Sequence, residues 1–268
     1  MIVEGTPQMI PALSQIWAAC FGDSPDYIRF FMEKRFPTCR CFVWLEREHP
    51  VGVAYLLPCT LGERPAYYGY AIGVHPEFQS RGFCGEILWA AENFCEQKGA
   101  VFFVSPRPGV EEYYRKREFY PGFFHRIHRI VPTGVPESGV KISQAGPEEY
   151  LALRDTFFRG PGYVAWDIGA VTYALEELRL CGGFAHVLYW SGKRYLLFGA
   201  KQKGILSVKE TTIPSEILDR LASALCILYD VSELVVECPA DSFENGTPRG
   251  CCWNFTLDVP GWLGFDLT

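Results

Sequence analysis

The stretch of residues 67–95 constrains the fold most, because a strand, a short loop and a helix follow one another there without interruption. Residues 67–74 form an aromatic and aliphatic run that is typical of a strand. Between Cys84 and Cys95, apolar residues recur at helical spacing, with polar residues on the other side. The loop of residues 79–85 therefore leads directly into the first turn of a helix.

That loop has the features of a binding site for an anion. The first N–H groups of a helix have no partner within it, and the helix dipole adds partial positive charge there. Gly82 and Gly85 carry no side chain that would keep a phosphate from the backbone, and Arg81 is placed to add a charged hydrogen bond. Glycines also occur in ordinary strand-to-helix connections, so a simple turn stays open as the alternative.

The full string of residues 74–85, Val-His-Pro-Glu-Phe-Gln-Ser-Arg-Gly-Phe-Cys-Gly, resembles motif A of the GCN5-related N-acetyltransferases (GNATs). That motif is Gln or Arg, two residues, Gly, one residue, then Gly or Ala, and Cys84 departs from it at the last position. The resemblance implies that the loop binds the pyrophosphate of acetyl-CoA and that the preceding strand pairs with the pantetheine arm. The implied cofactor-binding residues are Ile72, Gly73, Val74, Gln79, Ser80, Arg81, Gly82, Phe83, Cys84 and Gly85.

A second string with family character lies within residues 110–123. Tyr114, Lys116 and Phe119 match the family pattern Tyr-x-Lys-x-Gly-Phe. Glu118 replaces the glycine, so we expect the helix before it to end without a left-handed cap. The resemblance implies that Tyr114 is the general acid that protonates the departing CoA thiolate. A tyrosine packed under the sheet, with its hydroxyl at the rim, is the alternative.

The bulk composition argues against several other classes of protein. The chain has 268 residues, of which 49% are hydrophobic and 21% charged, as in soluble globular proteins. Its net charge of −6 argues against nucleic acid or an anionic membrane as a partner. No signal peptide and no membrane-spanning run is evident, so we expect a cytoplasmic protein. The eleven cysteines lack zinc-site spacing, and no metal is expected.

The order of predicted elements indicates two copies of one fold. In the first half, two helices precede a strand hairpin, the strand and helix around the loop, and a buried strand at residues 100–104. Turn-forming residues then cluster at 133–139, which we interpret as a linker. The second half repeats the order, with helices at 147–158 and 168–180, strands at 184–190, 195–200 and 205–211, a helix over 217–228 and a strand at 233–238.

We therefore predict an α/β (α+β) fold with two tandem acyl-CoA N-acyltransferase-like domains, each a mixed, mostly antiparallel sheet flanked by helices. The predicted domains are residues 1–132, with the acetyl-CoA site, and 140–268, a degenerate copy without a phosphate loop. Where the second loop would lie, residues 212–216 contain no glycine, and Thr212 is the predicted N-cap of the following helix.

The tandem arrangement resembles the enhanced-intracellular-survival acetyltransferases, which act on amines and have one active copy of the fold. In that group the chain's terminal carboxylate acts as general base, which implies Thr268 here. A frayed, polar terminus is the alternative. Glu63 and Glu33 are the other acids near the predicted site, and the identity of the base stays open.

We predict an N-acetyltransferase that transfers an acetyl group from acetyl-CoA to a primary amine of a small molecule or peptide. Two alternatives stay open: a non-catalytic CoA-binding sensor or scaffold, which the off-pattern Cys84 and Glu118 favour, and an aminoacyl-tRNA-dependent transferase. The net charge and the complete loop argue against the second. The acceptor amine, the natural acyl group and the oligomeric state are not specified by the sequence.

Overall fold

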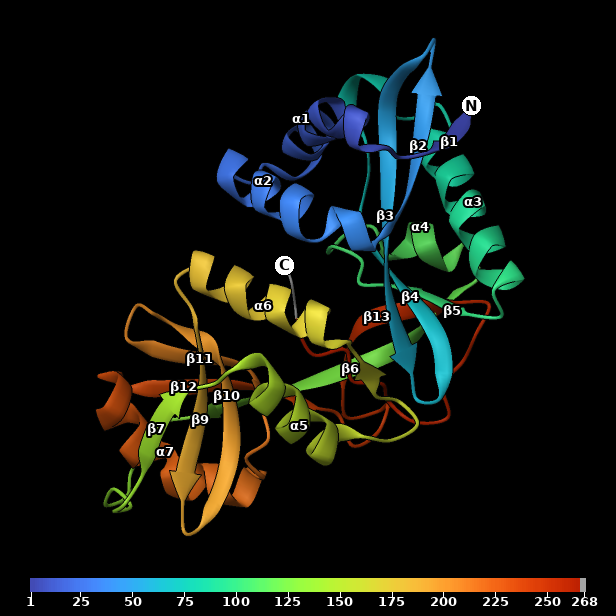
Figure 1. The fold of residues 1–268 in the computed structure, drawn as a ribbon. Helices are drawn as coiled ribbons and strands as arrows, with labels where there is room; N and C mark the ends of the chain where they lie inside the picture. The colour runs from blue at the N-terminus through green and yellow to red at the C-terminus, as the bar shows by residue number, and fades with distance from the viewer. Residues whose placement is uncertain (266–268) are drawn as a thin grey trace. The chain divides into compact units, whose positions relative to one another are not determined.

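The computed structural model describes residues 1–265, which form two compact units (Figure 1). The first unit contains residues 1–122 and 249–256, and the second contains residues 123–248 and the chain from 257 onward. Each unit is a mixed sheet flanked by helices, so the predicted fold class is confirmed. Among the helices of residues 1–265, none combines the length and the apolar composition that crossing a membrane requires.

The first unit has a sheet in the order β1-β2-β3-β4-β5-β13. Helix α3 lies against one face of this sheet and α1 against the other (Figure 1). Its elements are β1 (Ile2–Glu4), α1 (Ile10–Phe21), α2 (Pro25–Lys34), β2 (Arg40–Glu46), β3 (His49–Leu61), β4 (Arg64–Val74), α3 (Phe83–Gln97), β5 (Val101–Val104), α4 (Glu111–Arg115) and most of β13 (Thr247–Trp253).

The second unit has a sheet in the order β6-β12-β11-β10-β9-β7. Its elements are most of β6 (Phe119–Ile130), β7 (Lys141–Gln144), α5 (Pro147–Phe158), β8 (Val164–Ala165), α6 (Ile168–Leu180), β9 (Phe184–Trp190), β10 (Lys193–Gln202), β11 (Ile205–Thr211), α7 (Ser215–Tyr229) and β12 (Glu233–Pro239). The prediction that Thr212 is the N-cap of α7 is wrong. Pro214 takes that position, because the Thr212 hydroxyl accepts a hydrogen bond from Leu196 N at 2.8 Å instead.

The two sheets have the same pairing pattern. In the first unit, β1, β2, β3 and β4 pair antiparallel in turn, β4 and β5 pair parallel, and β5 and β13 pair antiparallel. In the second, β7, β9, β10 and β11 pair antiparallel in turn, β11 and β12 pair parallel, and β12 and β6 pair antiparallel. This agreement shows the internal repeat directly, although little sequence is shared between the halves.

The last strand of each sheet is supplied by the other half of the sequence. The chain leaves the first unit within β6, between residues 122 and 123, and β6 completes the second sheet by pairing with β12. Conversely, β13 follows the second half of the chain but pairs with β5, where Cys251 faces Val104. The sequence analysis did not anticipate this exchange. The compact units thus differ in their bounds from domains at 1–132 and 140–268, which stay a prediction.

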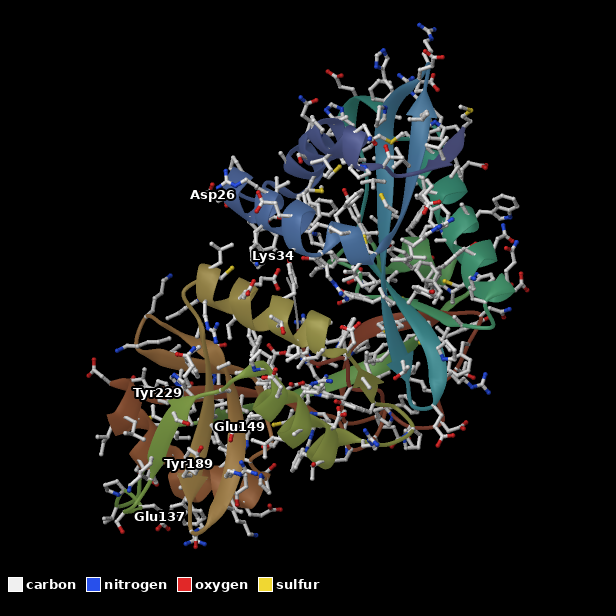
Figure 2. The ribbon with its side chains drawn as sticks, viewed as in Figure 1. Asp26, Lys34, Glu137, Glu149, Tyr189 and Tyr229 are labelled. Atoms are coloured by element: carbon white, nitrogen blue, oxygen red, sulfur yellow. The ribbon has the colours of Figure 1, made fainter. Side chains whose placement is uncertain are left out.

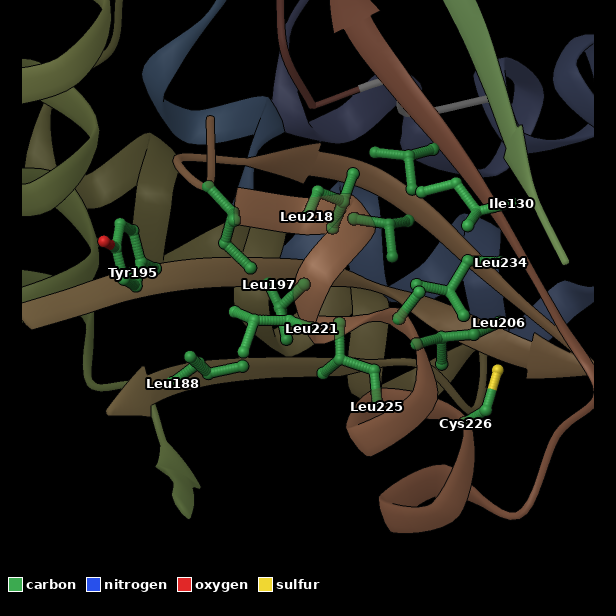
Figure 3. Packing of buried hydrophobic residues seen from close by; sticks show 14 residues of the cluster. Ile130, Leu188, Tyr195, Leu197, Leu206, Leu218, Leu221, Leu225, Cys226 and Leu234 are labelled. Carbon is green, nitrogen blue, oxygen red and sulfur yellow. The ribbon is translucent and has the colours of Figure 1, made fainter. Parts of the chain in front are cut away.

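Each sheet has a closely packed core on one face. In the first unit, residues of α3 such as Ile87 and Leu88 pack with Phe102 and Phe119. In the second, leucines of α7 pack against β10, β11 and β12 (Figure 3). Both cores follow from the apolar stripes predicted for these two helices, because the stripe of each amphipathic helix covers the apolar face of its sheet.

The second unit also contains a buried ion pair, Arg154 with Glu210, whose side chains are both fully inaccessible to solvent. Arg154 Nε lies 2.9 Å from Glu210 Oε1, and Arg154 Nη2 donates to the carbonyl oxygen of Leu263 at 3.1 Å. The Glu210 carboxylate also accepts hydrogen bonds from Tyr150 Oη at 2.6 Å and from Trp262 Nε1 at 2.9 Å. The pair therefore attaches residues 262–263 to the interior of this unit.

Candidate functional site

The first unit contains a cavity of about 620 Å³ at the point where β4 ends and α3 begins. One wall is the loop between these elements with the first turns of α3, and the other comes from α4 and the residues just after it. The cavity is lined by Val74, Phe78, Gln79, Ser80, Gly82, Phe83, Cys84, Gly85, Glu86, Trp89, Tyr113 and Arg117.

Seven of the ten predicted cofactor-binding residues line this cavity, namely Val74, Gln79, Ser80, Gly82, Phe83, Cys84 and Gly85. Ile72, Gly73 and Arg81 do not. Arg81 turns back from the loop, with its guanidinium carbon 5.1 Å from the centre of the Phe78 ring and Nη2 3.4 Å from the carbonyl oxygen of Glu77. The loop therefore lines the cavity, but the guanidinium of Arg81 does not.

The backbone of the loop leaves the start of α3 open. Gly82 is the N-cap with φ of 84°, and no side chain caps the helix at this position. Ser80 also has positive φ, at 61°. The first hydrogen bond of the helix runs from Glu86 N to the carbonyl oxygen of Gly82, so the N–H groups of the three residues between have no partner in the helix itself. Such a turn is suited to bind an anion through backbone N–H groups.

Strand β4 is distorted where it reaches the cavity. Ala71 has φ of 44°, and the register with β3 shifts at this point, which is a β-bulge. The parallel pairing of β4 with β5 ends at Gly69 and Val104, whereas β4 itself continues to Val74. Residues 70–74 thus extend beyond the end of β5, and this edge of β4 is where an extended ligand would find strand N–H and C=O groups.

The loop is fixed to the end of β4 by side chains. Gln79 Nε2 donates to the carbonyl oxygen of Val74 at 3.0 Å, and Cys20 Sγ lies 3.2 Å from the same oxygen. Phe83, the first residue of α3, stacks on Trp44 with 4.7 Å between ring centres. These contacts hold the strand end and the helix start in a defined relation, as a preformed site requires.

The two adjacent tyrosines of α4 lie in different environments, one in the core and one at the cavity. Tyr114 is 9% exposed and packs in the core, with its ring centre 5.2 Å from that of Phe119. Burial raises the pKa of the Tyr114 hydroxyl well above its ordinary value, so it stays protonated at neutral pH. Tyr113 is 40% exposed and lines the cavity together with Cys84. The role of Tyr114 as general acid stays a prediction, and Tyr113 is its neighbour at the cavity surface.

Helix α4 ends at a right-handed cap, Lys116, as expected, but Glu118 two residues later is left-handed. Glu118 has φ of 63°, the left-handed conformation in which the family pattern has glycine, so the chain after α4 turns as it would with glycine. The conformation is strained for a residue with a Cβ. Two backbone hydrogen bonds support it: Glu118 N donates to the carbonyl oxygen of Arg115 at 3.3 Å, and Asn254 N donates to the carbonyl oxygen of Glu118 at 2.8 Å. Thr268, the predicted base, lies outside the described residues.

Sequence reasoning missed the one cation among the described residues that line the cavity, Arg117. Its Nη2 donates to the carbonyl oxygen of Gly85 at 3.1 Å and lies 3.4 Å from the carboxylate of Glu92. Burial raises the pKa of Glu92, while the positive charge of Arg117 opposes that shift. Arg117 stands at a variable position of the Tyr-x-Lys-x-Gly-Phe pattern, so no motif singles it out. Phe78, Glu86 and Trp89 were also missed.

Comparison with known proteins gives a family match for part of the chain and a similar fold for most of it. Residues 7–119 match the model of the acetyltransferase (GNAT) family. A conserved protein of Enterococcus faecalis V583, described as a probable N-acyltransferase, has a similar structure, with a TM-score of 0.76, 12% identity, and coverage of 94% of this chain and 72% of that one. Comparison of the sequence with curated proteins gave no match.

Two further solved structures bear on the tandem arrangement. Eis1 from Mycobacterium abscessus has a TM-score of 0.65 and 14% identity, with coverage of 94% of this chain and 72% of that one. A tandem GNAT protein from the clavulanic acid biosynthesis pathway has a TM-score of 0.57 and 12% identity, covering 94% and 96%. At these identities the likeness concerns the fold. Residues 7–119 of this chain are thus similar to the acetyltransferase (GNAT) family, and 94% of the chain matches the fold of Eis1 and of a tandem GNAT protein.

Proposed function

We propose that the protein is an N-acetyltransferase that transfers an acetyl group from acetyl-CoA to a primary amine of a small molecule or peptide. One observation carries the proposal. Two features meet at a single cavity: the uncapped start of α3 at the positive-φ Gly82, and the bulged strand β4, which extends beyond the end of β5. Both lie in the part of the chain that matches the acetyltransferase family. The first feature suits a pyrophosphate and the second an extended pantetheine arm.

The loop and the strand would divide the binding of the cosubstrate between them. Backbone N–H groups of Phe83, Cys84 and Gly85, at the positive end of α3, would donate hydrogen bonds to the pyrophosphate oxygens. The edge of β4 at Ile72–Val74 would pair with the amide groups of the pantetheine arm. A strand N–H beside the bulge would then polarise the thioester carbonyl and stabilise the oxyanion that forms when the amine attacks.

A proton must reach the sulfur as the C–S bond breaks. Tyr114 would supply it, since a hydroxyl with a raised pKa is protonated at the pH where the amine reacts. The attacking amine must in turn lose a proton, and the carboxylate of Thr268 stays the proposed base. A CoA-binding sensor would bind the same ligand and transfer nothing, so turnover with any amine separates the two functions.

The first test is calorimetry with acetyl-CoA on the wild type and on Gly82→Glu. The variant places a side chain in a left-handed position, at a cost of about 1–2 kcal/mol, and directs negative charge at the phosphates. We expect one-to-one binding by the wild type and a loss of affinity of at least about tenfold in the variant.

Gly139→Glu is the matched control, because Gly139 also has positive φ, at 75°, and nothing lies within 4 Å of the added Cβ. Gly139 does not line the cavity. We expect its affinity for acetyl-CoA to equal that of the wild type. A wild type that fails to bind acetyl-CoA would overturn the proposed function, and binding at two equivalent sites would show that the second unit also binds the cosubstrate.

A further inference from the structure

Arg117 lines the cavity and lies just after α4, apart from the loop in sequence. It follows α4 by two residues, yet its guanidinium lies against the first turn of α3. Besides the hydrogen bond from Nη2 to the carbonyl oxygen of Gly85, Nη1 would lie 3.2 Å from a Cβ built on Gly85. The absence of a side chain at Gly85 therefore lets the guanidinium approach the same turn whose N–H groups face the cavity.

The hydrogen-bonding capacity of Arg117 is only partly used. A guanidinium has five N–H donors. Within the described residues, those of Nη2 reach Gly85 and, at 3.4 Å, the two carboxylate oxygens of Glu92, whereas Nε is buried and has no partner. The Glu92 side chain is 8% exposed and that of Arg117 is 28% exposed. Glu92 therefore contacts Arg117 on its buried side, and part of the arginine stays accessible.

Arg117 is the main source of positive charge among the side chains that line the cavity. Among the lining residues, which all belong to the described chain, Arg117 is the one cation and Glu86 the one carboxylate. Arg81, whose place before the helix start suggested it as a phosphate partner, turns toward Phe78. Helix N–H groups and the dipole contribute only about half a positive charge. A pyrophosphate in the loop therefore lacks a full counter-charge unless Arg117 provides it.

We propose that Arg117 binds the pyrophosphate of the acyl donor, opposite the backbone N–H groups of the loop, and that Glu92 positions it. The inference rests on the proposed function and adds a side-chain partner that the family motif does not contain. A guanidinium donates charge-assisted hydrogen bonds to phosphate oxygens, and the Nη1 group, which lies beside Gly85 and for which the described residues supply no acceptor, would donate them here. The donor is then a nucleotide thioester, acetyl-CoA, and not an acyl-pantetheine without a pyrophosphate.

A set of three ligands tests this by calorimetry and competition: CoA, dephospho-CoA, which lacks the 3′-phosphate, and pantetheine, which has no phosphate. In Arg117→Met we expect the affinities for CoA and dephospho-CoA to fall about equally, by about tenfold or more, since a charged hydrogen-bond pair is lost. The affinity for pantetheine should change less than about twofold, because Arg117 does not reach it. Arg117→Lys should recover part of the loss.

Two further variants control for the fold. Arg115→Met removes an exposed arginine of α4 that pairs with Glu112, and it should bind all three ligands like the wild type. The double variant Arg117→Met with Glu92→Gln removes the buried charge that the single change would leave unpaired, and it should show the same loss for CoA as the single variant.

Three results would overturn the inference. These are an unchanged CoA affinity in Arg117→Met, an equal loss for pantetheine, which would mean a structural effect, and a loss confined to CoA, which would assign Arg117 to the 3′-phosphate. A wild type that binds neither CoA nor dephospho-CoA would instead refute the proposed function, so the two failures are distinguishable.

Discussion

In Tyr114→Phe, kcat for acetyl transfer is expected to fall by about a hundredfold to ten-thousandfold, the usual contribution of a general acid. The ring stays in the core against Phe119, so the fold should be retained. The affinity for acetyl-CoA should also be retained, since Tyr114 does not line the cavity. Release of free CoA thiol, followed with an amine acceptor found by screening, measures the effect.

Tyr113→Phe is the matched control for this experiment. It removes the hydroxyl of the neighbouring tyrosine, whose side chain lines the cavity. We expect its kcat to stay within about threefold of the wild type, since its hydroxyl has no proton-transfer role in the proposed mechanism. If Tyr113→Phe instead shows the large loss and Tyr114→Phe does not, the role of acid belongs to Tyr113.

The pH profile gives a second check on Tyr114. Burial raises its pKa above the ordinary value of about 10, so the folded protein disfavours the tyrosinate. The hydroxyl is then protonated throughout the range below pH 10, and no loss of kcat between about pH 8 and 10 is expected from this group. The stability due to the buried, neutral hydroxyl is fully present below about pH 10 and decreases as the pH rises toward the raised pKa.

In Arg154→Met, the free energy of unfolding is expected to fall by about 3–5 kcal/mol, because the Glu210 carboxylate would stay buried without its counter-charge. The carbonyl oxygens of Val164 and Leu263 would also lose a donor. Urea denaturation measures the change. The double variant Arg154→Met with Glu210→Leu should recover much of the loss, since an apolar pair in place of a buried ion pair is often tolerated.

Arg194→Met is the control for a surface ion pair. Arg194 bonds to Glu149 at 3.1 Å but is 57% exposed, and Figure 2 labels this glutamate. We expect a loss of less than about 1 kcal/mol. Should the double variant at positions 154 and 210 be as unstable as Arg154→Met alone, the hydrogen bonds to the backbone, and not the unpaired charge, would explain the loss.

Local sequence patterns predicted the elements that build the site. The helix stripes, the glycine loop and the run before it depend on residues close in the chain, and α3, β4 and Gly82 lie where these patterns placed them. The distinction between Tyr113 and Tyr114 was harder to predict, because α4 has five residues and gives too little periodicity to fix its orientation. Arg117 was missed because its partners, Gly85 and Glu92, are brought to it only by packing.

The strand β13 was missed for a different reason. Thr247–Trp253 contains Pro248 and Gly250, which weaken any strand signal. Its place in the sheet depends on pairing with β5, which is remote in sequence. Likewise, Arg81 lies in the loop where a phosphate partner is expected but contacts Phe78, since the sequence gives the residue type and not the rotamer that its neighbours select.

The exchange of last strands has a consequence for how the protein is made. During synthesis the N-terminal part of a chain ordinarily folds first, as soon as its own elements are complete. Here β5 pairs with β13, so the first sheet lacks its final strand until residues 247–253 have been synthesised and have left the ribosome. Pairing over so long a separation is also slow. We therefore infer that the site-bearing unit, although it is translated first, completes its sheet only after most of the second unit has been synthesised.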